Sequence, residues 1–329
     1  MPEHKNHDVN ASDESKQFLE YATVYHAPVL CNTVIEGLIT DSNGVYLDAT
    51  FGGGGHSAAI LDNLGPDGRL IGVDQDDEAL SQGRLRLPKA IKDGRLKLVK
   101  ANFGDLASIV SEQTDGKIEG VLFDLGVSSH QIDAGVRGFS FRNDGPLDMR
   151  MDQSSEIDAD MIVNTWDDSE LVYVFRKYGE EPRAKAVARA IVKARPIRDT
   201  NHLADVIRGA VFVLHEAKTV TRVFQAIRIR VNEELDVLES ALQAAAMVLK
   251  PGGRIVAISY HSLEDRRVKR YLRTGKFKGQ LDRDLYGNAL SPFKEITRKP
   301  ISASDSEKEG NPRARSARLR IAERTDLSL

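Results

Sequence analysis

The chain has 329 residues, with 46 lysines and arginines against 49 aspartates and glutamates, and its net charge of −3 does not by itself indicate a nucleic-acid partner. Hydrophobic residues make up 41% of it, enough for one large or two ordinary domains. Its single cysteine, Cys31, excludes an internal disulfide and predicts a cytoplasmic protein. No apolar run approaches the length of a membrane span, and the polar residues 1–20 are predicted to be a disordered leader.

The most informative stretch is Val45–His56, with the sequence V-Y-L-D-A-T-F-G-G-G-G-H. Its start predicts a buried strand, the four glycines predict a tight turn, and Ser57 begins a predicted helix. Glycines let the backbone approach a ligand closely, and a helix N-terminus offers free N–H groups to an anion. Asp74 ends the next predicted strand, Arg69–Val73, where an acid is expected to bind ribose hydroxyls. The alternative is a structural strand–helix–strand unit with a surface aspartate.

Strands and helices continue to alternate up to about residue 132. A helix is predicted at Cys31–Leu38, before the glycine turn. The third strand, Leu96–Val99, is followed by Phe103, which either stacks on an adenine ring or caps the sheet as a core residue. The run Val121–Phe123 is typical of a buried parallel strand and leads into Asp124. Ligands bind at the carboxyl ends of such strands, so Asp124 is a candidate site residue.

From about residue 133 the pattern becomes helical, which predicts an inserted all-helical domain over residues 133–235. Helices are expected over Asp168–Tyr178, from Pro182 to Arg195, and over His202–His215 with Thr200 as N-cap. The second of these carries basic residues with no acid between positions 183 and 198. A solvated face is the usual explanation, and contact with a polyanion is the alternative. The basic residues are Arg183, Lys185, Arg189, Lys193, Arg195 and Arg198.

The α/β pattern resumes at about residue 236. An amphipathic helix reaches Leu249, a Lys-Pro-Gly-Gly turn follows, and a strand is predicted over Arg254–Ser259. His261 comes just after this strand, so a second ionisable side chain is expected at a strand end. Two late runs, Lys294–Arg298 and Ala317–Ala322, are predicted to form a terminal antiparallel pair.

A strand–glycine–helix site with one acid for a ribose suits a nicotinamide dinucleotide or S-adenosylmethionine. A dehydrogenase is expected to carry a second glycine fingerprint, and none is found in the sequence. The L-K-P-G-G turn and the late strand pair are usual in class I methyltransferases. The sequence therefore favours an α/β fold of the class I, Rossmann-like, S-adenosylmethionine-dependent type with an inserted all-helical domain. The methyltransferase domain is expected to comprise residues 21–132 and 236–329.

Five longer motifs are D-A-T-F-G-G-G-G-H-S, D-L-G-V-S-S, R-G-F-S-F-R-N-D-G-P-L-D-M-R-M-D, Y-H-S-L-E-D-R and N-P-R-A-R-S. Together they resemble the RsmH (MraW) family of 16S rRNA (cytosine(1402)-N(4))-methyltransferases, from about residue 25 to the C-terminus. The resemblance implies methylation of the exocyclic amine of a cytosine in the decoding region. It thus implies S-adenosylmethionine as cofactor and 16S rRNA or the small ribosomal subunit as partner. A monomer and a homodimer both stay open.

The same resemblance, carried over motif by motif, assigns residues to each part of the cofactor. The glycine loop surrounds its methionine part, Asp74 binds the ribose and Phe103 flanks the adenine. Two positions depart from the family pattern. His130 stands where many relatives have a proline, and Gly53 stands where some relatives have an arginine. The implied cofactor residues are Gly54, Gly55, His56, Asp74, Phe103, Asp124 and Gln131.

The amine of cytosine is a poor nucleophile because its lone pair is delocalised into the ring. A carboxylate or carbonyl that accepts its hydrogen helps to localise the pair and then takes the proton. Our candidate is Asp124 or a backbone carbonyl of residues 125–127, and a pure cofactor-binding role for Asp124 is the alternative. His261 is the second candidate, as a base or as a contact to the base edge. The sequence contains no cysteine–histidine cluster typical of a metal site.

The target base must leave its stack to reach the methyl donor. Phe139 and Phe141 either stack on RNA bases or anchor the insert onto the α/β domain. Other open functions are a class I methyltransferase with another substrate, a non-catalytic ribosome-assembly factor and, more remotely, a dehydrogenase. The candidate RNA-binding residues are Phe139, Phe141, Arg189, Lys193, Arg266, Arg313 and Arg315.

Overall fold

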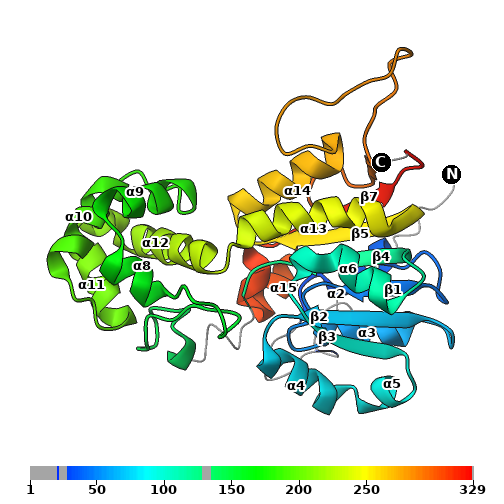
Figure 1. Cartoon of the computed structure of the whole chain (residues 1–329), viewed down its shortest axis with the longest axis horizontal. Coiled ribbons are helices and arrows are strands. Elements are labelled where there is room, and N and C mark those ends of the chain that lie inside the picture. The colour runs from blue at the N-terminus through cyan, green and yellow to red at the C-terminus, as the bar shows by residue number, and fades with distance from the viewer. Residues whose placement is uncertain (1–20, 22–27, 128–134, 328–329) are drawn as a thin grey trace, which may run out of the picture.

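The computed structural model describes residue 21, residues 28–127 and residues 135–327. Seven strands form one sheet: β1 Val45–Asp48, β2 Arg69–Asp74, β3 Leu96–Lys100, β4 Ile118–Asp124, β5 Leu249–Ser259, β6 Phe293–Glu295 and β7 Arg318–Arg324. Their order is β3-β2-β1-β4-β5-β7-β6 (Figure 1). The strands from β3 to β5 in this order are parallel, whereas β7 is antiparallel to both β5 and β6. The predicted fold class and the terminal strand pair are confirmed.

Side chains that alternate along the strands enter two separate apolar cores. Tyr46 and Leu122 face one core, whereas Leu47, Val121 and Phe123 face the other. Both faces of the sheet are thus covered by helices, so the carboxyl ends of the strands are the edge where a ligand can reach the parallel strands. One face carries α2 Cys31–Leu38, α3 Gly55–Asn63, α4 Asp77–Arg86 and α5 Pro88–Lys92; the other carries α6 Leu106–Gln113, α13 Glu234–Val248 and α14 Ser262–Thr274.

Between β4 and α13 the described residues contain helices and no strand. These helices are α8 Ala159–Thr165, α9 Asp168–Lys177, α10 Ala184–Ala194, α11 Thr200–Gly209 and α12 Glu216–Val231. They pack around their own apolar core, to one side of the sheet (Figure 1). That core also includes Val127, after β4, and Leu263, after β5. The helical insert therefore borders the carboxyl ends of the parallel strands.

The boundaries of α11 differ from the prediction. Its N-cap is Asp199, whose carboxylate accepts the backbone N–H of His202 at 2.7 Å, and Thr200 is the first helical residue. The helix ends at Gly209 instead of continuing to residue 215. Residues 213–215 form a separate short 3-10 turn whose apolar side chains are exposed, so their hydrophobicity did not signal a buried helical face.

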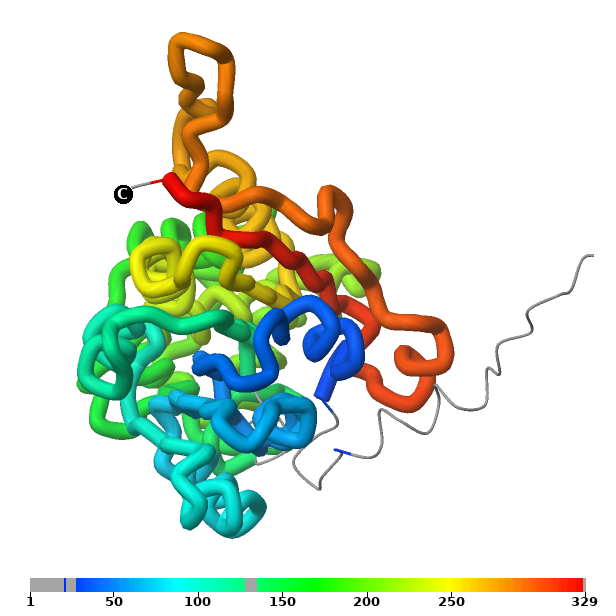
Figure 2. The backbone as a smooth tube through the Cα atoms, turned by 90° about the vertical axis from the view of Figure 1, so that its right-hand side faces the viewer, coloured from blue at the N-terminus to red at the C-terminus, as the bar shows by residue number. Residues whose placement is uncertain are grey.

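The C-terminal region returns to the start of the fold. Figure 2 shows the segment before β7 lying against the first helix of the described chain. There the backbone N–H of Leu30 donates to Glu307 Oε1 at 2.7 Å, which joins α2 to α15 (Asp305–Gly310). No helix in the described part of the chain has the length and apolar character needed to cross a membrane.

Candidate active site

A buried and a half-buried carboxylate lie where β1 and β2 end. Asp48 is 1% exposed and accepts the hydroxyl of Ser57, in the first turn of α3, at 2.7 Å. Asp74 accepts the backbone N–H groups of Gly52 at 2.8 Å and Asp76 at 2.9 Å. Burial raises the pKa of Asp48, and it raises the pKa of Asp74 to about 6. Since an ionised carboxylate has about four acceptor positions, Asp74 retains room for two hydroxyl donors.

Asp124, at the end of β4, joins three elements in one polar group. Its Oδ1 accepts the hydroxyl of Tyr260 at 2.6 Å, and its Oδ2 lies 3.6 Å from His56 Nδ1. The other ring nitrogen of His56 lies 2.9 Å from the carbonyl oxygen of Val29, which can only accept, so Nε2 carries a hydrogen. Burial and the neighbouring Asp124 raise the pKa of Tyr260, which keeps the phenol protonated as a donor. Sequence motifs far apart thus meet around Asp124.

The glycine turn requires its glycines for geometric reasons. Gly54 has a φ of +70°, and a Cβ at this position would lie 2.8 Å from the ring of Phe51. The turn leads directly into α3, which begins at Gly55 and His56. The first N–H groups of a helix have no partner within it, so this end of α3 presents donors beside Asp124.

A hollow of about 30 Å³ lies beside Phe103, which packs edge-to-face on Phe123 with ring centres 5.9 Å apart. It adjoins a larger hollow of about 490 Å³, and Gln75 lines both. The larger hollow has the volume of a small-molecule site, whereas the smaller hollow beside Phe103 has room for about one water molecule. Gln75 Nε2 donates to Met151 Sδ at 3.1 Å. A purine beside Phe103 therefore requires these two side chains to separate.

We call the region at the carboxyl ends of β1 to β4, around Asp48, Asp74 and Asp124, the crevice. The chemistry of its residues fits an adenosyl amino acid. Asp74 offers acceptors for ribose hydroxyls, Phe103 offers an aromatic contact, and Asp124 stands beside the N-terminus of α3. These three side chains follow three different parallel strands, as the sequence predicted. Gln131 and His130 lie outside the described residues, as do residues 1–20.

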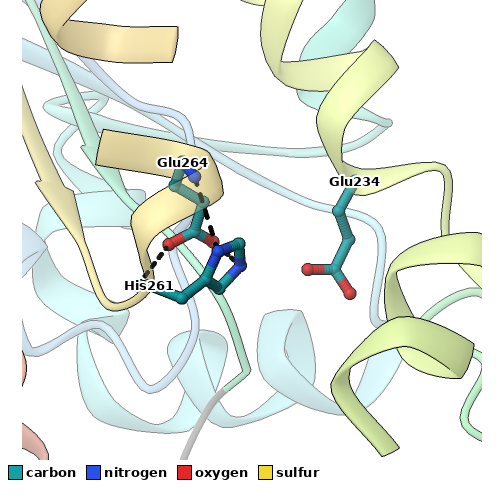
Figure 3. A group of neighbouring side chains, drawn as sticks. All are labelled: Glu234, His261 and Glu264. Atoms are coloured by element: carbon teal, nitrogen blue, oxygen red, sulfur yellow. Dashed lines mark hydrogen bonds and ion pairs between the residues drawn. The ribbon is translucent and has the colours of Figure 1, made fainter. Parts of the chain in front are cut away.

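His261 lies at the start of α14, beside Glu264 and opposite Glu234 (Figure 3). Its Nδ1 accepts the N–H of Glu264 at 3.4 Å, so His261 is the N-cap of α14. Atoms of these three residues lie within 4.8 Å of one another, as in a metal site. However, Arg228 donates two hydrogen bonds to Glu234, at 2.8 and 2.9 Å, and supplies the cationic partner. We interpret the cluster as a helix cap that fixes the edge of the crevice.

Of the candidate RNA-binding residues, Phe139 lies in the core of the insert and Phe141 packs against that core. Phe139 is 9% exposed, and Phe141 packs edge-to-face on Phe224 with ring centres 5.3 Å apart. Phe139 is buried and Phe141 is half-buried against this core, which favours the anchoring alternative over stacking on RNA. They anchor the insert, because an apolar ring gains more from this contact than from exposure.

The basic candidates divide into two groups. Arg189 and Lys193 on α10 are exposed, and so is Arg315. Arg266 instead pairs with Glu180 of the insert at 2.9 Å, so it joins the insert to α14. Arg313 is half-buried, with its guanidinium over the ring of Tyr260.

Sequence reasoning missed several residues of the crevice. Tyr260 stands within a motif that drew attention only for His261, and Asp48 within the glycine motif. Arg137 is buried and pairs with Asp76 at 3.2 Å, joining the start of the insert to the loop after β2. Glu234 begins a helix whose apolar stripe was the only feature recognised. The sequence signal that could have identified most of these residues is a charged side chain next to a predicted strand end or within a recognised motif.

Known proteins match nearly the whole chain. The model of the MraW methylase family matches residues 23–325. Ribosomal RNA small subunit methyltransferase H of Amoebophilus asiaticus is 46% identical over 94% of this chain and 98% of its own, and that of Flavobacterium johnsoniae is 45% identical over 91% and 98%. The alignment with an rRNA methylase structure from Streptococcus thermophilus covers 90% of this chain and 94% of that one, with only 13% identity and a TM-score of 0.40. The chain belongs to the MraW methylase family.

Proposed function

We propose that the chain transfers a methyl group from S-adenosylmethionine to the N4 amine of a cytosine in 16S rRNA, at the 1402-type position of the small ribosomal subunit. The observation that carries this proposal is the family match over residues 23–325. The acid-lined crevice at the strand ends supports it, because its donors and acceptors suit the cofactor. The names of the relatives support the choice of small-subunit RNA as substrate, and a ribosomal substrate is consistent with the predicted cytoplasmic location.

The proposed cofactor would lie across the ends of β1, β2, β3 and β4. Asp74 would accept the ribose hydroxyls, Phe103 would flank the adenine, and Asp124 would face the methionine part. Gly54, Gly55, His56 and, from the resemblance, Gln131 would complete the set. The cofactor supplies a methyl group on a good leaving group, so the chain has to align it with the amine and to exclude water.

Asp124 is the proposed acceptor of the proton that the amine loses. Tyr260 already donates to Oδ1, so Oδ2 is the oxygen left to receive it. His56 Nδ1, 3.6 Å away, stands next in line. His261, which caps α14 at the edge of the crevice, remains the second candidate for the proton acceptor. A general base of this kind typically contributes about 10²- to 10⁴-fold to the rate.

Residues 133–235 are the proposed substrate-recognition domain. On α10, Lys185, Arg189 and Lys193 are exposed along one face at spacings of four, and no acid interrupts them between positions 183 and 198. Such a face suits RNA phosphates, and each neutralised phosphate adds to the salt dependence of binding. Arg315 is proposed to extend this contact from the C-terminal loop.

Mass spectrometry of small-subunit RNA after deletion of the gene tests the proposal. We expect the loss of one N4-methyl group on cytosine, restored by the wild-type gene and not by a cofactor-site variant such as Asp74→Ala. Delayed subunit maturation with all cytosine methyl groups intact would instead indicate an assembly factor. Loss of a methyl group from another nucleotide would indicate a different methyltransferase.

A further inference from the structure

Arg313 places a buried, unpartnered donor at the candidate active site. It lies in the 3-10 turn η4 (Pro312–Arg315), with its guanidinium carbon 4.9 Å from the centre of the Tyr260 ring. The hydroxyl of the same ring donates to Asp124. Arg313 Nη1 is buried and has no hydrogen-bond partner. A buried N–H without a partner is costly, which makes it an indicator of a missing ligand.

Other arginines in the described part of the chain show that this arrangement is unusual. Arg95, Arg137, Arg254 and Arg320 also have one buried nitrogen without a partner. Each of these four, however, donates from another guanidinium nitrogen to a carbonyl or pairs with a carboxylate. Among these five, only Arg313 has a guanidinium whose one contact is an aromatic ring. Within the described ranges, no carboxylate pairs with its charge.

The position of Arg313 is fixed by the turn around it. Asn311 Oδ1 accepts the backbone N–H of Arg313 at 3.2 Å, and Ala314 is fully buried. The preceding helix α15 is joined to α2 by the hydrogen bond from Leu30 N–H to Glu307 Oε1. A side chain held in this way binds an anion without a large loss of conformational entropy.

We propose that Arg313 binds the α-carboxylate at the amino acid end of the cofactor, while Asp124 faces its α-ammonium group. The inference rests on the proposed function, since it names a contact within the same site. A carboxylate and an ammonium on one carbon need an acceptor and a cationic donor close together, and Tyr260 links such a pair by contacting both residues. The buried Nη1 suits a small ligand better than a phosphate on the outer surface of an RNA, whereas exposed Arg315 suits the RNA.

Binding of two ligands that differ by one group tests the proposal. Calorimetry would compare S-adenosylmethionine with decarboxylated S-adenosylmethionine, which lacks only the carboxylate. For the wild-type protein we expect the first to bind about 10- to 100-fold more tightly, as for one charged hydrogen-bonded pair. Arg313→Gln should lose most of this preference and bind the decarboxylated ligand as the wild type does. Arg313→Lys should keep part of it.

A matched control separates the contact from general damage. Arg315→Gln changes an exposed arginine of the same turn and should retain the wild-type preference. Equal preferences in the wild type and Arg313→Gln would overturn the inference and leave the proposed function standing. The same holds if Arg313→Gln loses affinity for small-subunit RNA and keeps the ligand preference, because the anion would then be a phosphate. Failure of the wild type to bind either ligand would instead contradict the proposed function itself.

Discussion

The strand-end crevice and the basic face of α10 use charge in opposite ways. In the crevice, Asp48, Asp74 and Asp124 are held by hydrogen bonds from hydroxyl and backbone groups, and Asp48 and Asp124 are buried. On α10, Arg189 and Lys193 point into solvent. Buried and oriented charges act strongly on one ligand, whereas exposed charges act weakly, additively and subject to salt. The crevice is therefore suited to chemistry and the α10 face to holding a large polyanion.

The largest effect is expected for Asp124→Asn, which keeps the shape of the side chain but removes its basicity. If Asp124 accepts the amine proton, single-turnover methyl transfer should slow by about 10²- to 10⁴-fold. Affinity for S-adenosylhomocysteine should also fall, since Asp124 is proposed to face its α-ammonium group, so the rate is compared at saturating cofactor. Cofactor affinity and the single-turnover rate would be measured on the same preparation. A fall in affinity with an unchanged rate at saturation would show that Asp124 only binds the cofactor.

Asp74→Ala is the next largest, because it removes the acceptors for two ribose hydroxyls. We expect a loss of about 100-fold in affinity for S-adenosylhomocysteine, measured by calorimetry. Asp77→Ala, at an exposed acid three residues along the chain, serves as the control and should bind as the wild type does. Equal losses in the two variants would point to a general disturbance of the loop after β2.

Cofactor binding should weaken in acid. Burial raises the pKa of Asp74 to about 6, and protonation removes acceptor positions that the ribose needs. Affinity is therefore expected to be constant above about pH 7 and to fall by up to about tenfold per unit well below pH 6. Calorimetry across this range would measure it. In Asp74→Asn, which cannot titrate, the dependence should flatten; an identical profile would assign the titration to another group.

A smaller and salt-sensitive effect is expected for Arg189→Glu on α10. Filter binding to small-subunit RNA should weaken by roughly 5- to 10-fold at low salt and by less at high salt, as for loss of a phosphate contact. Lys92→Glu reverses an exposed charge on α5, away from the insert, and should have little effect. If the two reversals weaken binding equally, net charge rather than the α10 face is responsible.

The smallest effect concerns the narrow hollow beside Phe103. Met151→Ala should remove the contact with Gln75, a residue that also lines this hollow. Stopped-flow measurements should then show association of S-adenosylhomocysteine accelerated by about two- to fivefold, since a closed binding site lowers the apparent affinity and rate. Met247→Ala, at an exposed methionine of α13, is the matched control. An unchanged association rate would mean that these side chains part without cost.

Local pattern was enough to predict the sheet and the strand-end acids. The alternation of strands and helices placed Asp74 and Asp124 at one edge, because parallel strands share the direction of their ends. It could not predict the partners of Asp124, since His56 and Tyr260 come from positions 68 before and 136 after it and meet only through the fold. Phe139 and Arg313 show that the sequence also could not predict which aromatic and basic side chains are exposed. An aromatic or basic residue has the same letter whether it faces solvent or a core, and burial depends on distant elements.

The central claim is that this crevice carries a methyl group to a cytosine amine. The most direct test incubates the purified protein with unmodified small ribosomal subunits and S-adenosylmethionine labelled in the methyl group, followed by nucleoside mass spectrometry. Labelled N4-methylcytidine, at one site per subunit and absent with Asp74→Ala, is the predicted result. Label on ring carbon 5, on a ribose hydroxyl or on no nucleoside would contradict the account.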